Sequence, residues 1–131
     1  MSIDLSGKSV LVTGASIGIG RETALRFAAA GCRVALTYLE HDAEAEQVAQ
    51  RCLGLGAPAV IAASLELSDE DSIRSVLERV IDEFGAPDVL VNNAGLIAWK
   101  PFLEQDFGEL DAQVNVNLLG GAMGLHRAEK C

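Results

Sequence analysis

The chain has 131 residues, a length that fits one domain with a single hydrophobic core. Half of its residues are hydrophobic and 22% are charged, which indicates a globular chain rather than a disordered one. The net charge of −9 excludes the basic footprint that nucleic acids and anionic membranes require, and no apolar run approaches the roughly 18 residues of a membrane span.

Short apolar runs alternate with amphipathic helical patterns from the start of the chain. The first apolar run, Ser9–Thr13, leads into a glycine-rich turn and a predicted helix over Gly18–Ala30. The second run, Arg33–Tyr38, precedes a helix that opens at Asp42 and ends at the glycines near position 55. This alternation predicts strands that are each followed by a helix.

The same alternation continues through the second half of the chain. A third apolar run covers Ala59–Ala63, and Ser68–Asp71 resembles a capping box for a helix that ends at Gly85. A fourth strand is predicted over Asp88–Asn92, and a last helix is predicted from about Asp106 towards the C-terminus. The chain therefore contains four predicted strand–helix units without an internal linker, and we expect one domain over residues 1–131.

The predicted strands are apolar throughout, which implies a sheet that is covered on both faces. Right-handed crossovers then give an α/β fold, a Rossmann-like doubly wound parallel sheet of strand order 3-2-1-4. Ligands of such sheets bind at the switch point between strands one and four. If the sheet ends at its fourth strand, that strand is an open edge. We then expect self-association, or pairing with another chain, through this strand and the last helix.

The turn Thr13–Gly20 reads Thr-Gly-Ala-Ser-Ile-Gly-Ile-Gly and lies at this switch point. Gly14 permits a tight exit from the strand, Gly18 lets the backbone approach phosphates, and Gly20 lets the helix pack closely on the strand. Ser16 offers a hydroxyl donor. The position of the turn, after a strand and before a helix, favours dinucleotide binding over a simple tight turn.

Two further motifs contain asparagine. In Asn92–Gly95, the amides can tie neighbouring segments together while Ala94 and Gly95 leave space for a cofactor. Asn117 shares a predicted helical face with apolar residues, namely Leu110, Val114, Leu118, Gly121 and Leu125. Two interpretations of Asn117 stay open: a core amide bonded to nearby backbone, or an amide that holds a water or kinks the helix at an active site. Asn115 falls on another face and is interpreted as ordinary.

Together these motifs resemble the short-chain dehydrogenase/reductase family over essentially the whole chain. The resemblance implies binding of NAD or NADP, and hydride transfer between the nicotinamide and a carbonyl or alcohol. Asn117 matches the asparagine that supports a water relay to the catalytic lysine in this family. The cofactor-binding residues implied by the resemblance are Gly14, Ser16, Ile17, Gly18, Ile19, Gly20, Tyr38, Glu66, Leu67, Asn93, Ala94 and Gly95.

The choice between NAD and NADP stays open at this point. Tyr38 stands where the family often has an aspartate for the ribose of NAD, and Ile17 stands where NADP users often have a basic residue. Glu40 would repel a 2′-phosphate if its side chain pointed inward. Glu66 and Leu67 stand where an aspartate normally contacts the adenine amine.

The catalytic serine and the Tyr-x-x-x-Lys pair of the family lie beyond the position of Asn117. The one tyrosine of this chain is Tyr38, and Asp42 rather than lysine follows it four residues later. We therefore expect the N-terminal, cofactor-binding part of such an enzyme, truncated after about four strands and not catalytically competent alone. The alternative is a non-catalytic dinucleotide-binding or regulatory module that pairs with another chain.

The cysteines Cys32, Cys52 and Cys131 form no Cys-x-x-Cys pair and have no metal-ligand spacing with either histidine, so no metal site is expected. An odd number of cysteines without a signal peptide indicates reduced thiols. We therefore expect a cytoplasmic protein.

Overall fold

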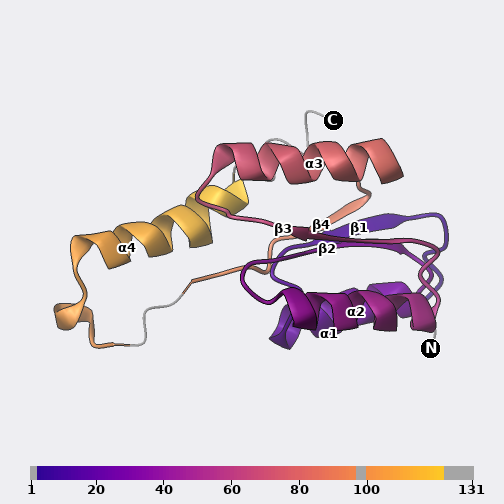
Figure 1. Ribbon diagram of the computed structural model, residues 1–131, viewed down its shortest axis with the longest axis horizontal. Coiled ribbons are helices and arrows are strands. Elements are labelled where there is room, and N and C mark those ends of the chain that lie inside the picture. Colours follow the sequence, from indigo (N-terminus) through magenta and orange to yellow (C-terminus); the bar gives the residue numbers. More distant parts are fainter. Residues whose placement is uncertain (1–2, 97–99, 123–131) are drawn as a thin grey trace.

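The computed structural model describes residues 3–96 and 100–122. Four strands alternate with helices in the predicted order (Figure 1). The elements are β1 (Ser9–Val12), α1 (Gly18–Ala29), β2 (Arg33–Tyr38), α2 (Asp42–Leu55), β3 (Val60–Ser64), α3 (Glu70–Phe84), β4 (Val89–Val91), the 3-10 turn η1 (Phe102–Glu104), α4 (Phe107–Val114) and the π-helical segment η2 (Asn115–Gly120).

The sheet has the strand order β3-β2-β1-β4, and each neighbouring pair of strands is parallel. This confirms the predicted doubly wound arrangement. Helices α1 and α2 cover one face of the sheet, whereas α3 covers the other (Figure 1). The carboxyl ends of β1 and β4 are neighbours, because Val12 pairs with Val91. The glycine turn that follows β1 and the asparagine motif that follows β4 therefore start side by side.

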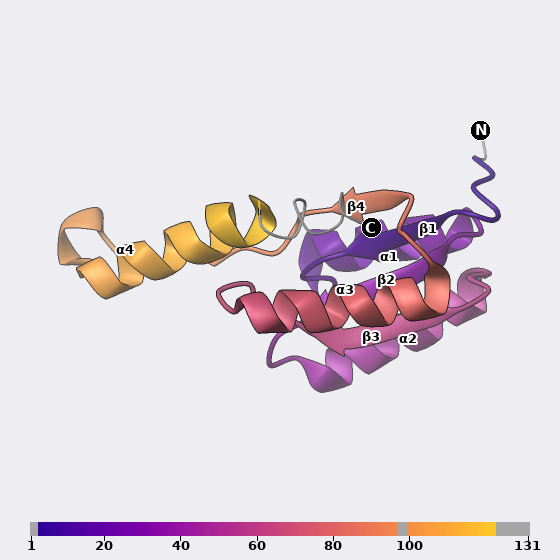
Figure 2. The ribbon, with the colours of Figure 1, turned by 90° about the horizontal axis from the view of Figure 1, so that it is seen from above.

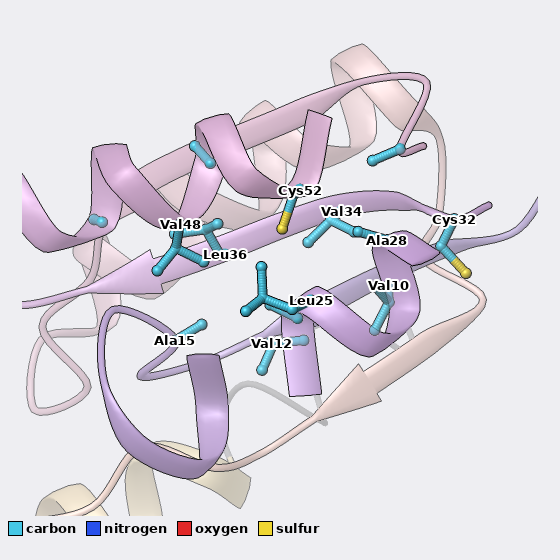
Figure 3. Packing of buried hydrophobic residues seen from close by; sticks show 14 residues of the cluster. Val10, Val12, Ala15, Leu25, Ala28, Cys32, Val34, Leu36, Val48 and Cys52 are labelled. Atoms are coloured by element: carbon cyan, nitrogen blue, oxygen red, sulfur yellow. The ribbon is translucent and has the colours of Figure 1, made fainter. Parts of the chain in front are cut away.

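Two hydrophobic clusters hold the helices on the sheet. Val10 and Val12 face the cluster under α1 and α2, whereas Leu11 between them belongs to the cluster under α3. The first cluster is shown in Figure 3, where Leu25 of α1 is grouped with Val12 of β1 and Leu36 of β2. Successive side chains of a strand point to opposite faces, so the two clusters together bury both faces of β1. This is why the strands are apolar throughout rather than alternating.

The start of α3 corrects one expectation. The predicted capping box placed Ser68 at the N-cap, but Asp69 is the N-cap and accepts a hydrogen bond from the Asp71 backbone nitrogen at 2.9 Å. The Ser68 hydroxyl instead donates to Oε1 of Glu66 at 2.8 Å. Asp69 is still in extended conformation, so the helix begins one residue later than the pattern indicates.

The last helix corrects a second expectation. It starts after Asp106, as predicted, and the Asp106 carboxylate accepts a bond from the Glu109 nitrogen. The core interpretation of Asn117 is not supported, because its apolar neighbours on the predicted face are exposed: Val114 is 51% exposed and Leu118 is 64% exposed. The helix extends beyond the end of the sheet (Figures 1 and 2), and its hydrogen bonding changes to the π pattern from Asn115 onwards. Leu125 lies outside the described residues.

Candidate functional site

The turn between β1 and α1 is held in place by hydrogen bonds to Thr37 of the neighbouring strand β2. Gly14 has φ +65°, a left-handed conformation that favours glycine, and its backbone nitrogen donates to the Thr37 hydroxyl at 3.3 Å. The Ala15 nitrogen donates to the Thr37 carbonyl at 2.8 Å. Thr37 is 1% exposed, so the chain direction at the turn is set by a buried residue of the neighbouring strand.

Asn93 ties the end of β4 to the same turn. Its side-chain amide donates to the carbonyl oxygens of Thr13 at 3.1 Å and Gly14 at 3.0 Å. In the opposite direction, the Thr13 hydroxyl accepts from the backbone nitrogens of Asn93 and Ala94, both at 3.1 Å. The predicted role of the asparagine motif, tying neighbouring segments together, is confirmed in these bonds.

Close packing explains two of the three glycines of the turn. A Cβ at Gly20 would overlap the Gly14 carbonyl oxygen and the Asn93 amide, and a Cβ at Gly14 would lie 2.9 Å from Cα of Ala94. A Cβ at Gly18 would meet nothing within 4 Å, but Gly18 has φ +60°. Gly20 therefore serves helix packing, whereas Gly18 leaves open space beside the start of α1.

The N-terminus of α1 suits an anion. Its N-cap, Ile17, makes no side-chain capping bond, and the first turn carries no acidic residue. By contrast, α2, α3 and α4 each have an acidic residue in the first turn, and α3 and α4 also have a capping carboxylate. Free backbone N–H groups and the helix dipole together favour a bound phosphate. The backbone at this point therefore fits the pyrophosphate of a dinucleotide.

A cleft of about 810 Å³ opens at this edge of the sheet. This volume lies in the range of small-molecule and cofactor sites, roughly 300–1,000 Å³. It is bounded by the glycine turn, the segments that follow β2, β3 and β4, and one side of α4 and η2. The residues that line it are Gly14, Ser16, Ile17, Thr37, Tyr38, Leu39, Glu40, His41, Leu65, Glu66, Leu67, Ser68, Asn93, Ala94, Gly95, Leu96, Gly108, Asp111, Ala112, Asn115 and Val116.

The cleft brings together nine of the twelve residues expected to bind the cofactor. Gly18, Ile19 and Gly20 are not among its lining residues. Ile19 is 79% exposed on the outer side of the turn, and with Gly18 it borders a shallower depression over α1. Glu66 lines the cleft, but one of its carboxylate oxygens is engaged by the Ser68 hydroxyl and backbone nitrogen.

Asn117 does not line the cleft. Its amide nitrogen donates to the Leu96 carbonyl at 2.7 Å, and its amide oxygen accepts from the Leu96 nitrogen. This corresponds to the interpretation of an amide bonded to nearby backbone, but Asn117 is exposed rather than part of the core. It joins η2 to the chain that follows β4, and a Cβ at Gly95 would lie 3.3 Å from its oxygen.

Several lining residues were missed by sequence reasoning. Thr37 is a polar residue inside an apolar strand, which was the available signal. Asp111 and Asn115 lie one helical turn apart, and the Asn115 amide donates to the Asp111 carboxylate at 3.0 Å. Asn115 was interpreted as ordinary, yet it lines the cleft, because it lies on the same helical face as Asp111 and Ala112.

Neither a membrane span nor a metal cluster is found in the part of the chain that the structure describes. No helix there has the length and apolar character needed to cross a bilayer. Likewise, no three His, Cys, Asp or Glu side chains among these residues gather closely enough to hold a metal ion.

The fold and the cleft define a Rossmann-like α/β protein. Comparison with known proteins identifies its family: residues 8–128 match the short chain dehydrogenase family, and the chain belongs to this family of oxidoreductases.

Two curated relatives and one solved structure illustrate the similarity. The chain is 37% identical over 113 residues to the 3-oxoacyl-acyl-carrier-protein reductase FabG of Staphylococcus aureus, covering 86% of this chain and 46% of the relative. It is 36% identical over 116 residues to an L-rhamnose 1-dehydrogenase (NAD(P)(+)) of a Sphingomonas species, covering 88% and 45%. The chain thus spans about half the length of these relatives.

The solved structure is a short chain dehydrogenase from Burkholderia cenocepacia in complex with NADP. It superimposes with a TM-score of 0.91 at 36% identity and covers 96% of this chain and 51% of its own. The fold of the four-stranded unit is therefore that of the family.

Proposed function

We propose that this chain is the dinucleotide-binding part of a short-chain dehydrogenase/reductase, and that NAD or NADP binds in the cleft at the carboxyl ends of β1 and β4. The observation that carries the proposal is that three features meet at one cleft: the uncapped N-terminus of α1, the glycine turn, and the hydrogen bonds from the Asn93 side chain to that turn. A relative named for NAD(P)(+) and a structural neighbour in complex with NADP support the same class of ligand.

Different segments of the chain would bind different parts of the cofactor. The first turn of α1, which begins at Gly18 after the N-cap Ile17, would hold the pyrophosphate through backbone N–H groups. The segment after β2 and the residues Glu66 and Leu67 would border the adenosine, and Ala94 and Gly95 would leave room beside β4 for the rest of the cofactor. When bound, the nicotinamide supplies a hydride acceptor or donor for a carbonyl or alcohol substrate.

The binding test is a calorimetric titration of the purified chain with NADH and with NADPH. We expect saturable binding of at least one of them. Ile17→Asp places a carboxylate at the start of α1, where the side chain is 49% exposed, and should weaken binding at least tenfold without unfolding the chain. Ile3→Asp, at a 65% exposed position outside the cleft, is the matched control. The absence of saturable binding by either nucleotide would remove the proposal.

We further propose that the 131-residue chain needs another polypeptide segment for hydride transfer. Tyr38 is the one tyrosine of the sequence, and it ends β2 with Asp42 four residues later. The pairing of a tyrosine with a nearby lysine that the family resemblance implies is therefore not available at this position. A carbonyl-reduction assay with NADH or NADPH tests this, and clear turnover by the purified chain would refute it.

A second candidate function is a dinucleotide-binding module that pairs with another chain. The exposed apolar side chains along η1, α4 and η2 favour it: Phe102 is 70% exposed, Leu103 94% and Phe107 90%. Such a cluster of large apolar residues is typical of interaction surfaces. Light scattering tests this prediction, and a stable monomer at both low and high concentration would contradict self-association.

A further inference from the structure

The sheet has a second open edge at β3, which is apolar and uncharged. In the described part of the chain, β3 has a neighbouring strand, β2, on one side only, and Figure 2 shows it at the side of the sheet away from β4. No charged residue occurs between Arg51 and Glu66, and residues 60–65 also contain no proline. Uncharged apolar segments on an open edge are typical sites of pairing between chains.

Alternate backbone groups of β3 point towards this open side. The Val34 nitrogen of β2 donates to the Ala59 carbonyl at 3.1 Å, and bonding to a given neighbour involves every second residue of a parallel strand. The backbone groups of Val60, Ala62 and Ser64 therefore point away from β2. We call these three residues the β3 edge, and none of them lines the cleft.

The side chain of Arg79 reaches the centre of the β3 edge from α3. Its Nη1 donates to the Ala62 carbonyl oxygen at 3.3 Å, and its Nε donates to Oε1 of Glu83 at 3.3 Å. The bond to Glu83, one helical turn further along α3, directs the guanidinium towards the strand. Among the described residues, no other side chain bonds to the backbone of the β3 edge. A positive charge therefore lies over the middle of an otherwise uncharged strand edge.

Two copies of the chain would be able to pair through the β3 edge about a two-fold axis at Ala62. In an antiparallel pair centred there, Ala62 lies opposite Ala62 and Val60 lies opposite Ser64, so the outward N–H and C=O groups of both strands meet. Arg79 opposes this pairing in two ways. It occupies the central carbonyl, and in the pair the two guanidinium groups would lie close together with like charges.

We propose that Arg79 blocks association of the chain through the β3 edge, and that the surface it blocks fits the β3 edge of a second copy. The proposal is independent of dinucleotide binding, since the β3 edge lies outside the cleft. It also differs from association through the exposed apolar side chains of α4 and η2, because it requires the pairing of strand backbones. Removal of the Arg79 side chain frees the Ala62 carbonyl and removes the like-charge contact, so it favours the pair.

The test compares Arg79→Ala with Arg74→Ala by light scattering over a series of concentrations. Arg74 is the matched control, because it lies on the same helix and its side chain is 47% exposed against 50% for Arg79. It pairs with Glu70 and Asp71 rather than with the sheet. We expect Arg79→Ala to associate at a concentration at least about tenfold lower than the wild-type chain, and Arg74→Ala to associate at the wild-type concentration. Ser64→Lys, at an exposed position of the β3 edge, should restore the wild-type value in the Arg79→Ala background.

The outcomes separate pairing of β3 from other causes of association. Equal association of Arg79→Ala and Arg74→Ala would overturn the proposal, because the two variants carry the same change in charge. Association of Arg79→Ala that Ser64→Lys does not reverse would also overturn it, since partial unfolding or association through another surface does not depend on a lysine at the β3 edge. Association of Arg79→Ala that returns to the wild-type value with Ser64→Lys would support it.

Discussion

Replacement of Asn93 by alanine is expected to destabilise the chain by about 2 kcal/mol. The side-chain amide donates two hydrogen bonds, to the carbonyls of Thr13 and Gly14, and both are partly buried. Each such bond contributes roughly 0.5–1.5 kcal/mol net, and a carbonyl left without a partner adds a desolvation penalty. The two losses occur together, because one amide group makes both bonds.

Urea unfolding followed by circular dichroism measures this effect. With a slope of roughly 1–3 kcal/mol per molar urea, the midpoint should fall by about 1 M. Asn92→Ala is the matched control, since Asn92 is exposed and its amide makes one long bond of 3.5 Å to the Gly121 carbonyl. We expect the control to lower stability by less than about 0.5 kcal/mol.

The reasoning is refuted if Asn93→Ala unfolds at the same urea concentration as Asn92→Ala. That result would mean that the turn after β1 is held by Thr37 and the backbone alone. If Asn93→Ala lost stability but kept its affinity for NADH, the result would contradict a second expectation, namely that the hydrogen bonds of Asn93 shape the proposed phosphate-binding backbone. Both quantities should therefore be measured on the same preparations.

Three further outcomes follow from local geometry. Gly20→Ala should lower the melting temperature by at least several degrees, because its Cβ overlaps backbone atoms, whereas Gly54→Ala, in open space on α2, should stabilise by roughly 0.5–1 kcal/mol. Asp69→Ala should cost about 1 kcal/mol through loss of the α3 cap, and Ser68→Ala should cost less; the reverse order in urea unfolding would restore the capping box that the sequence pattern predicts. Burial raises the pKa of Cys52 to about 11 from an ordinary value near 9, so the free energy of unfolding should fall as the pH rises from 9 to 11. Cys52→Ala should flatten this dependence on pH. An equally steep decline in that variant would contradict the prediction.

The fold could be predicted from the sequence because its strongest patterns act locally. Arg33–Tyr38 is predicted and observed as β2 with the same bounds, and the stripe of α3 ends before Gly85 as expected. A buried parallel sheet requires apolar strands, and the handedness of crossovers then leaves few arrangements. The order β3-β2-β1-β4 follows from these two constraints without any knowledge of side-chain contacts.

The predictions that were wrong or missed concern features that depend on contacts between residues distant in the sequence. Periodicity in steps of three and four placed Leu118 on an apolar helical face, but periodicity cannot show whether a second surface covers that face. Thr37 was overlooked for a related reason: a β-branched residue in a strand is common, and its two bonds to the glycine turn exist only in the folded chain.

Thr37 and Glu40 lie close together in the sequence but differ in burial and in their bonds to the glycine turn. Thr37 is buried, and its hydroxyl and carbonyl accept hydrogen bonds that hold the glycine turn in place. Glu40 is exposed, three residues later, and lies outside both hydrophobic clusters. A change at position 37 is therefore expected to alter the turn itself, whereas a change at position 40 is expected to leave the two bonds to the turn in place.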